Sequence, residues 1–364
     1  MILKDLKNNE RGSITVLVLS TMLLVVGIIF IAYFSMMNKS SSQQAQLRKI
    51  QEEYEVSNSM MDQAYDENYD PLLPGEVADG NENYIDSNGD EAYVPDGFEV
   101  LEEASTVEDG LVIQDANGNQ FVWIPVPEES IDTLYVRNTG YEHTGISAET
   151  YTDTGYLPDV LQPASDTAEA NEAAEKEAVR AAGGFWVSRF EAGNENGTLV
   201  SKQNVTVYGT SQAESKQLAK NFIVTDEVRS ALCSGIQWDI IMKTIDGKLD
   251  GTGNTYNITS YNTSRHKGSS VGVTNTGINE ADRVYNIYDL EGNAGEFVAE
   301  RTDYSSWLDP TLNGTYIYRG GNYMNSTSSL MLINYRIKPA SYRINAAGTG
   351  DSASSFRIVL YLIK

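Results

Sequence analysis

Three stretches near the end of this chain decide its fold: Asn286-Ile-Tyr-Asp-Leu-Glu-Gly-Asn-Ala-Gly-Glu-Phe297, Arg319-Gly-Gly-Asn-Tyr323 and Phe356-Arg-Ile-Val359. The Gly-Asn-x-x-Glu element inside the first stretch carries little information by itself. Its combination with an Arg-Gly-Gly-x-Tyr element and a closing Phe-Arg, in this order and at this spacing, is specific. Two upstream segments extend the pattern: residues 185–191, which favour a short strand, and residues 234–239, which favour the start of a helix.

The first stretch resembles the Gly-Leu-Tyr-Asp-Met-x-Gly-Asn-Val-Trp-Glu-Trp signature of the sulfatase-modifying-factor family, the formylglycine-generating enzymes, with Gly295 and Phe297 in place of the two tryptophans. The resemblance covers residues 121–359. It implies a C-type-lectin-like fold. We therefore expect an α+β domain with a twisted antiparallel sheet, two helices and long loops.

The cysteine content argues against the reaction of that family. The resemblance implies a copper site made by two cysteines after the Arg-Gly-Gly element, since Cu(I) prefers thiolates. Those positions hold Asn325 and Leu330, and the single cysteine of the chain, Cys233, lies far upstream. We expect no copper and no catalytic residues, and we expect Cys233 to be a small buried core residue. The two histidines, His143 and His266, fall in separate predicted loops. An enzyme of the same fold with unrecognised chemistry stays an alternative.

The resemblance also implies a structural calcium site in the first stretch. In the family, this segment binds Ca²⁺ through backbone carbonyls and the signature glutamate. The matching groups here are the carbonyls of Glu291, Gly292 and Ala294 and the carboxylate of Glu296. Hard oxygen ligands of this kind suit Ca²⁺. The alternative is that Glu296 and Asn293 only hold the turn through hydrogen bonds.

The polar C-terminal segment is the predicted ligand-binding surface. Asn, Tyr and Ser side chains alternate there around the apolar Met331, Leu332 and Ile333, and tyrosine offers a large contact area with few rotatable bonds. The predicted binding residues are Arg319, Asn322, Tyr323, Asn325, Ser326, Asn334, Tyr335 and Tyr342. The segment also resembles the variable C-terminal region of proteins diversified by retroelements, which share the fold; such diversification is an alternative.

Composition excludes several classes of partner. The formal net charge of −25 would repel nucleic acids and anionic membrane surfaces. One cysteine excludes an internal disulfide framework. The 22 tyrosines and 30 glycines favour a β- and loop-rich exported domain with a recognition surface.

The N-terminal region predicts a membrane anchor. Residues 14–34 carry no charge and would form a helix about 30 Å long, enough to cross the hydrocarbon core. We predict a leader or cytoplasmic segment at 1–12 and a transmembrane helix at 13–35. Basic residues on the two sides nearly balance, so composition places the C-terminal domain outside the cell. The predicted location is the cell membrane, with a single pass.

The residues before the anchor allow a second interpretation. Glu10-Arg11-Gly12 followed by Ser13 resembles the leader of type IV pilin-like proteins, which are cut after a glycine. Leu17 occupies the position at which pilins carry a glutamate. A plain anchor and a minor pilin-like subunit that binds other pilus or filament subunits both stay open.

The remainder of the chain divides by composition and periodicity. The predicted parts are a helical stalk at 36–66, an acidic disordered linker at 67–83, a β-hairpin lead-in at 84–120 and the main domain at 121–364. Asn88-Gly89 and Asn117-Gly118 predict turns between strands. Other expected elements are helices at 164–182 and 227–244 and a final strand at 358–363.

These observations predict a membrane- or filament-anchored surface protein, similar to an adhesin or a receptor, with a non-catalytic domain. Its ligand would be an extracellular protein or a glycan.

Overall fold

The computed structural model describes residues 83–137, 151–259, 272–302, 316–321, 344–346 and 354–363. The chain divides into two compact units, Met1–Pro71 and Leu72–Lys364, and all described residues belong to the second. The predicted leader, transmembrane helix, stalk and nearly all of the linker therefore lie outside the described residues. No helix within the described ranges combines the length and the apolar character needed to cross a membrane.

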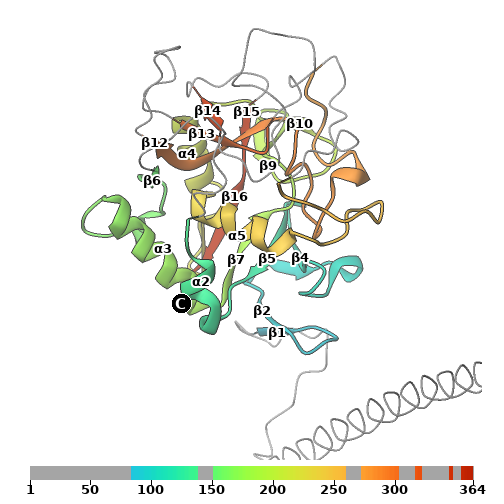
Figure 1. Cartoon of the computed structure of the whole chain (residues 1–364), viewed down its shortest axis with the longest axis horizontal. Helices are drawn as coiled ribbons and strands as arrows, with labels where there is room; N and C mark the ends of the chain where they lie inside the picture. The colour runs from blue at the N-terminus through green and yellow to red at the C-terminus, as the bar shows by residue number, and fades with distance from the viewer. Residues whose placement is uncertain are drawn as a thin grey trace, which may run out of the picture. The chain divides into compact units, whose positions relative to one another are not determined.

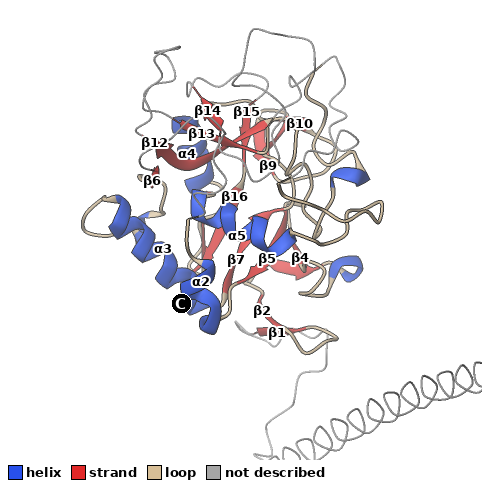
Figure 2. Ribbon diagram, viewed as in Figure 1, coloured by secondary structure: helices blue, strands red, loops and turns tan. Residues whose placement is uncertain are grey.

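The described part is an α+β structure dominated by sheets (Figures 1 and 2). The largest sheet has six strands in the order β11-β16-β7-β5-β4-β3, and every neighbouring pair is antiparallel. Its strands are β3 (Phe98–Val100), β4 (Val112–Asp115), β5 (Gln120–Pro125), β7 (Gly184–Ser188), β11 (Val228–Leu232) and β16 (Ile358–Leu362).

A second sheet has the order β14-β13-β12-β15, and β6 also pairs with β12. It occupies the upper part of Figure 1. The β12–β15 pair is parallel and the other pairs are antiparallel. Its strands are β6 (Tyr151–Asp153), β12 (Gly295–Thr302), β13 (Tyr316–Arg319), β14 (Ile344–Ala346) and β15 (Ser354–Phe356). The described residues also form two small sheets: β1 (Asn83–Ile85) with β2 (Glu91–Tyr93), and β10 (Thr206–Val207), β8 (Gly193–Glu195) and β9 (Thr198–Val200).

One residue joins the two large sheets. Strand β15 ends at Phe356 and β16 begins at Ile358, so only Arg357 separates strands that belong to different sheets. In Figure 2 the two strands follow each other from the upper sheet into the lower one. The Phe-Arg-Ile-Val element of the sequence is therefore the junction between the sheets.

Helices cover the sheets. They are α2 (Ile131–Leu134), α3 (Ala168–Ala182), α4 (Gln212–Lys220) and α5 (Gly235–Ile245), with 3-10 turns at Glu102–Ala104, Glu128–Ser130, Asp159–Leu161 and Glu280–Asp282. Helix α3 packs on β16 and β7, α4 on β11, and α5 on β12. The predicted helix at 164–182 is confirmed with a later start, because the hydroxyl of Thr167 accepts the Ala170 N–H and caps the first turn. It ends as predicted at Gly183, whose φ of 74° is the left-handed cap that glycine adopts without strain.

The predicted helix at 227–244 is wrong in its first part. Residues Val228–Leu232 form β11, which pairs along its whole length with β16. Helix α5 starts only after Ser234, where Ser234 and Gln237 form a capping box. Pairing with a strand more than a hundred residues away overrides local helix propensity here.

Both predicted Asn-Gly turns lie between paired strands. Strands β1 and β2 flank the Asn88-Gly89 turn, in which the Asp86 carboxylate accepts the N–H groups of Asn88 and Asp90 at 2.7 and 2.9 Å. Strands β4 and β5 flank Asn117-Gly118. The six-stranded sheet runs without a break across the predicted boundary at 120/121, since β4 pairs with β5.

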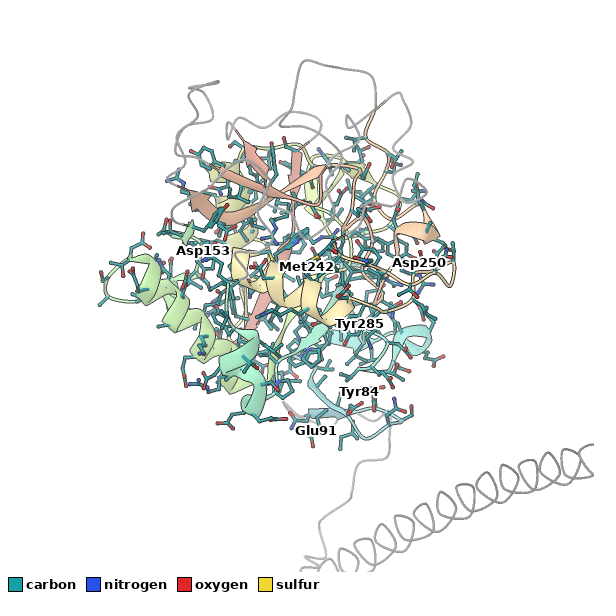
Figure 3. The ribbon with its side chains drawn as sticks, viewed as in Figure 1. Tyr84, Glu91, Asp153, Met242, Asp250 and Tyr285 are labelled. Atoms are coloured by element: carbon teal, nitrogen blue, oxygen red, sulfur yellow. The ribbon has the colours of Figure 1, made fainter. Side chains whose placement is uncertain are left out.

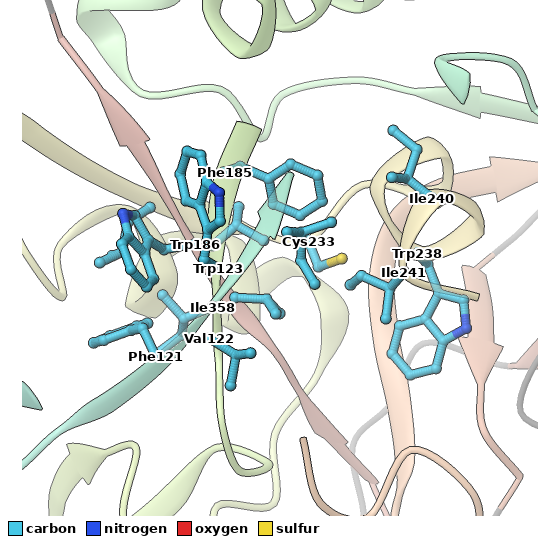
Figure 4. Packing of buried hydrophobic residues seen from close by; sticks show 14 of the residues in the cluster. Phe121, Val122, Trp123, Phe185, Trp186, Cys233, Trp238, Ile240, Ile241 and Ile358 are labelled. Atoms are coloured by element: carbon cyan, nitrogen blue, oxygen red, sulfur yellow. The ribbon is translucent and has the colours of Figure 1, made fainter. Parts of the chain in front are cut away.

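The main core lies on the six-stranded sheet (Figure 4). The rings of Trp123 and Trp186 have centroids 5.0 Å apart across neighbouring strands. Cys233 is fully buried between this group and the apolar residues of α5, as the sequence predicted. Figure 3 shows the side chains that fill the space around α5, on which Met242 lies.

Candidate functional site

The signature stretch forms a tight buried loop before it enters β12. Asn286, Asp289, Gly292 and Asn293 all have left-handed backbone conformations, with φ of 58°, 57°, 91° and 51°. Asn, Asp and Gly are the residue types that adopt this conformation most readily. The Asn and Gly positions of the signature are thus explained by the path of the backbone.

Polar side chains of this loop form hydrogen bonds with residues that are distant in the sequence. The Asn286 amide donates to the carbonyl of Gly110 at 2.8 Å, and the Asp289 carboxylate accepts the Gly277 N–H at 2.6 Å. The Asn293 amide donates to Glu191 at 2.6 Å. The loop therefore ties the lead-in hairpin and the end of β7 to the second sheet, and Asn293 has the hydrogen-bonding role that the sequence left open.

Arg357 fixes the junction between the two sheets. Its Nε lies 2.6 Å from Oε1 of Glu296, and neither side chain is exposed. The other guanidinium nitrogens donate to the carbonyls of Ser188, at 3.2 Å, and of Tyr288. Glu296 lies opposite Ser355 in the parallel β12–β15 pair. The motif arginine and the signature glutamate form one buried ion pair that locks β12, β15 and β7 together.

This ion pair bears on the predicted calcium site. The carboxylate of Glu296 already contacts a guanidinium, the Gly292 N–H donates to the Gly320 carbonyl at 2.8 Å, and the Ala294 N–H donates to Glu191 at 3.0 Å. Glu291 is buried. In the described ranges, no three His, Cys, Asp or Glu side chains converge as metal ligands. A Ca²⁺ ion held as the resemblance implies would share Glu296 with Arg357. The calcium site stays a prediction.

Burial makes this cluster of acids sensitive to protons. It raises the pKa of Glu191 well above its ordinary value, that of Asp289 to about 6 and that of Glu296 to about 8, while the guanidinium of Arg357 opposes each rise. Three buried carboxyl groups thus face one buried cation. Protons can enter the cluster near neutral pH.

Arg319 of the Arg-Gly-Gly element is also fully buried. Its Nη2 lies 2.6 Å from Oδ1 of Asp239 on α5, its Nη1 lies 3.8 Å from Glu300 on β12, and its guanidinium stacks 5.7 Å from the Trp238 ring. Gly320 follows with φ of 79°, and a Cβ there would lie 2.9 Å from the Leu290 carbonyl. The element is an anchor for the end of β13, so Arg319 does not offer its charge on the surface.

The other predicted ligand-binding residues, Asn325 among them, lie outside the described residues, as does Leu330. The structure does describe both ends of their segment. Strand β13 precedes it and β14 follows it, and the two strands pair antiparallel, with Tyr318 opposite Ile344 and Tyr316 opposite Ala346. The described residues on the two sides of segment 322–343 therefore lie on neighbouring strands of the second sheet.

No protein-family model matches the chain, and no curated protein matches it. Among solved structures, it is similar to Treponema denticola variable protein 1, with 12% identity over 73% of this chain and 99% of that chain. The TM-score is 0.26. A likeness of that strength establishes neither family nor function.

Two further networks of buried polar side chains were not predicted from the sequence. In one, Glu300 pairs with Arg137, whose Nη2 lies 2.9 Å from Asp153 of β6. Asp153 is labelled in Figure 3. Partners 163 positions apart leave no local signal. In the other, Glu175 of α3 accepts hydrogen bonds from the hydroxyl groups of Tyr135, of Tyr361 at 2.6 Å and of Ser234 at 3.0 Å.

A signal for Glu175 was present in the spacing of α3. Asn171, Glu175 and Val179 are the buried residues of this helix, and a spacing of four residues places them on one face. Burial raises the pKa of Glu175 to about 7.

In the described part of the chain, the motif side chains are buried and bound to other protein groups, which is the arrangement of a scaffold.

Proposed function

We propose that this chain is a membrane- or filament-anchored cell-surface binding protein whose domain is formylglycine-generating-enzyme-like, with a C-type-lectin-like fold, and non-catalytic. One observation carries the proposal. The β13–β14 register brings together the described residues on the two sides of segment 322–343, and buried ion pairs at Arg319 and Arg357 hold the sheet to which these strands belong. Loops mounted on a rigid scaffold are the usual place for binding residues.

The ligand contacts would come from the polar residues of that segment. These are Asn322, Tyr323, Asn325, Ser326, Asn334, Tyr335 and Tyr342. In this proposal Arg319 positions the segment and does not touch the ligand. In this proposal the ligand is an extracellular protein or glycan, since the negative net charge argues against nucleic acids, and the domain lies outside a membrane crossed once.

Binding is tested with the full chain on an array of immobilised extracellular proteins and glycans. We expect wild type to bind a defined subset of spots, and the triple variant Tyr323→Ala/Tyr335→Ala/Tyr342→Ala to lose that subset. The matched control replaces three tyrosines of the predicted stalk and linker, Tyr54, Tyr65 and Tyr69, and should bind as wild type does. Equal loss in both triple variants, or no loss in either, would contradict the proposal.

The enzyme alternative has a direct assay. The full chain, with copper supplied, should leave a cysteine-containing sulfatase peptide unchanged by mass. Conversion of its cysteine to formylglycine would replace the proposal with an enzymatic function.

The intact mass of the chain purified from its own cells distinguishes a pilin-like subunit from a plain membrane anchor. An N-terminus at Ser13 indicates a pilin-like subunit, and one at Met1 indicates a plain anchor.

Calcium binding is a separate proposal with its own measurement. Ca²⁺ held by Glu296 and the carbonyls of Glu291, Gly292 and Ala294 would raise the melting temperature of the full chain, because a ligand of the native state stabilises it by mass action. Mg²⁺ serves as the control, since it demands smaller and more regular coordination. A melting temperature that is the same in Ca²⁺, Mg²⁺ and chelator removes the site from the proposal.

A further inference from the structure

A broad groove lies where the turn after β4, the β8–β9 hairpin and α4 meet. Its volume is about 810 Å³, within the range of roughly 300–1,000 Å³ that is usual for ligand sites. The apolar part of its lining includes Leu199, Leu218, Phe222 and Ile223, which are partly exposed and pack on the core. The rest of the lining is mostly polar, so the groove combines an apolar floor with hydrogen-bonding walls.

The charged groups of the groove already have partners. Lys202 Nζ lies 2.6 Å from the Glu195 carboxylate. The carboxylate of Asp115 accepts hydrogen bonds within its own turn, and that of Glu214 accepts the Thr210 hydroxyl at 2.7 Å. The single cation is neutralised and the surplus charge is negative. An anionic ligand such as a phosphate or sulfate would therefore be repelled.

Most of the polar groups that are left for a ligand are amides. Asn117, Asn196, Gln217 and Asn221 are exposed and line the groove, and their side chains make no hydrogen bond within the described part of the chain. Gln217 and Asn221 are one helical turn apart, so they lie on one side of the groove. Each amide offers a donor and an acceptor, which matches the dual character of a hydroxyl group.

We propose that this groove binds a neutral oligosaccharide. Sugar hydroxyls would pair with the free amides, and the apolar C–H face of a sugar ring would pack on Phe222, whose ring lies 6.3 Å from that of Phe121. An extended peptide is the competing ligand, because β9 is an edge strand of its sheet. The unpaired amide side chains favour the sugar. The site is separate from segment 322–343 and goes beyond the function proposed for it.

The test is calorimetric titration of the full chain with linear neutral hexasaccharides of glucose and of N-acetylglucosamine. A zwitterionic detergent is required, because maltoside and glucoside head groups would compete. At least one neutral hexasaccharide should bind at millimolar concentration or below. The double variant Gln217→Ala/Asn221→Ala should bind it about tenfold or more weakly, and Phe222→Leu several-fold more weakly. Asn88→Ala, an exposed amide in a distant turn, should bind as wild type does.

Two comparison ligands separate the outcomes. A hexamer of galacturonate carries the same kind of ring with charge, and an extended peptide tests the edge of β9. Binding of the galacturonate hexamer or of the peptide alone would overturn the assignment to a neutral sugar. Failure of every neutral hexasaccharide, or binding that the double variant leaves unchanged, would overturn the site.

Discussion

Arg357 combines two roles in one residue, since it links the last strand residue of one sheet to the first strand residue of the other and it neutralises Glu296. A buried ion pair of this kind adds little stability relative to an apolar pair, but loss of one partner leaves an uncompensated charge. The loss of stability caused by a substitution here therefore depends on whether a buried charge is left without its partner.

Arg357→Met should lower the free energy of unfolding by about 3–5 kcal/mol, because Glu296 would be buried without its partner. The double variant Arg357→Met/Glu296→Leu should lose less than the sum of the two single variants. Urea unfolding of the four chains measures this coupling. Additive losses would show that the two side chains do not act as a pair.

Glu175 gives stability a pH dependence of definite sign. Its pKa is raised from 4.5 to about 7 in the folded chain, so the folded state keeps a proton that the unfolded chain releases. The contribution is fully present below about pH 4.5 and is lost as pH rises through about 7, roughly 3 kcal/mol in total. Glu175→Gln does not titrate. Between about pH 5 and about pH 8, the free energy of unfolding of wild type should fall by roughly 3 kcal/mol more than that of Glu175→Gln. Parallel curves would show that Glu175 is ionised in the folded chain.

At the scale of single elements, the two serine caps differ in what their hydroxyls bind. Ser211 caps α4 by accepting the Glu214 N–H. Ser234 caps α5 in the same way and also donates to Glu175 at 3.0 Å. The same substitution should therefore cost different amounts at the two positions.

Ser211→Ala should cost about 1 kcal/mol, the usual value of an N-cap. Ser234→Ala should cost about 2–3 kcal/mol, because a hydrogen bond to a buried carboxyl group is lost as well. Denaturant unfolding of both variants gives the comparison. Equal losses would mean that the bond between Ser234 and Glu175 contributes nothing to stability.

Elements with a local signal were predictable from the sequence. The helix that ends at Gly183, the two Asn-Gly turns and the final strand were predicted because caps, periodicity and turn residues lie within a few positions of each other. Strand β11 was mistaken for the start of a helix, since its partner β16 is remote in sequence.

The candidate site was also predictable only in part. The motifs identified Arg319, Glu296 and Arg357, but not that each is buried in an ion pair. Those pairings depend on the arrangement of sheets, and the spacing of residues within a motif does not encode it.

At the scale of the whole molecule, Cys233 reports on global unfolding. It is the only cysteine in the chain and is fully buried, and burial raises the pKa of its thiol. Thiol reagents attack the exposed thiolate. A chromogenic disulfide reagent should therefore label native protein only at the rate at which the domain opens, and the labelling should follow urea unfolding measured by fluorescence.

Ala116→Cys provides the control for this experiment. Ala116 is exposed in the turn between β4 and β5, so one equivalent of thiol should react at once in this variant. Fast reaction of a thiol in native wild type would show that the region around Cys233 opens locally.

The junction at Arg357 also sets the order in which the molecule can be completed. Strand β16 lies between β11 and β7 inside the six-stranded sheet, and β15 flanks β12 in the other sheet. Both strands are synthesised after every strand with which they pair. While the chain is being made, each large sheet therefore lacks a strand, and the acids around Glu296 lack their cation. Both large sheets can therefore be completed only after residues 354–362 have been made.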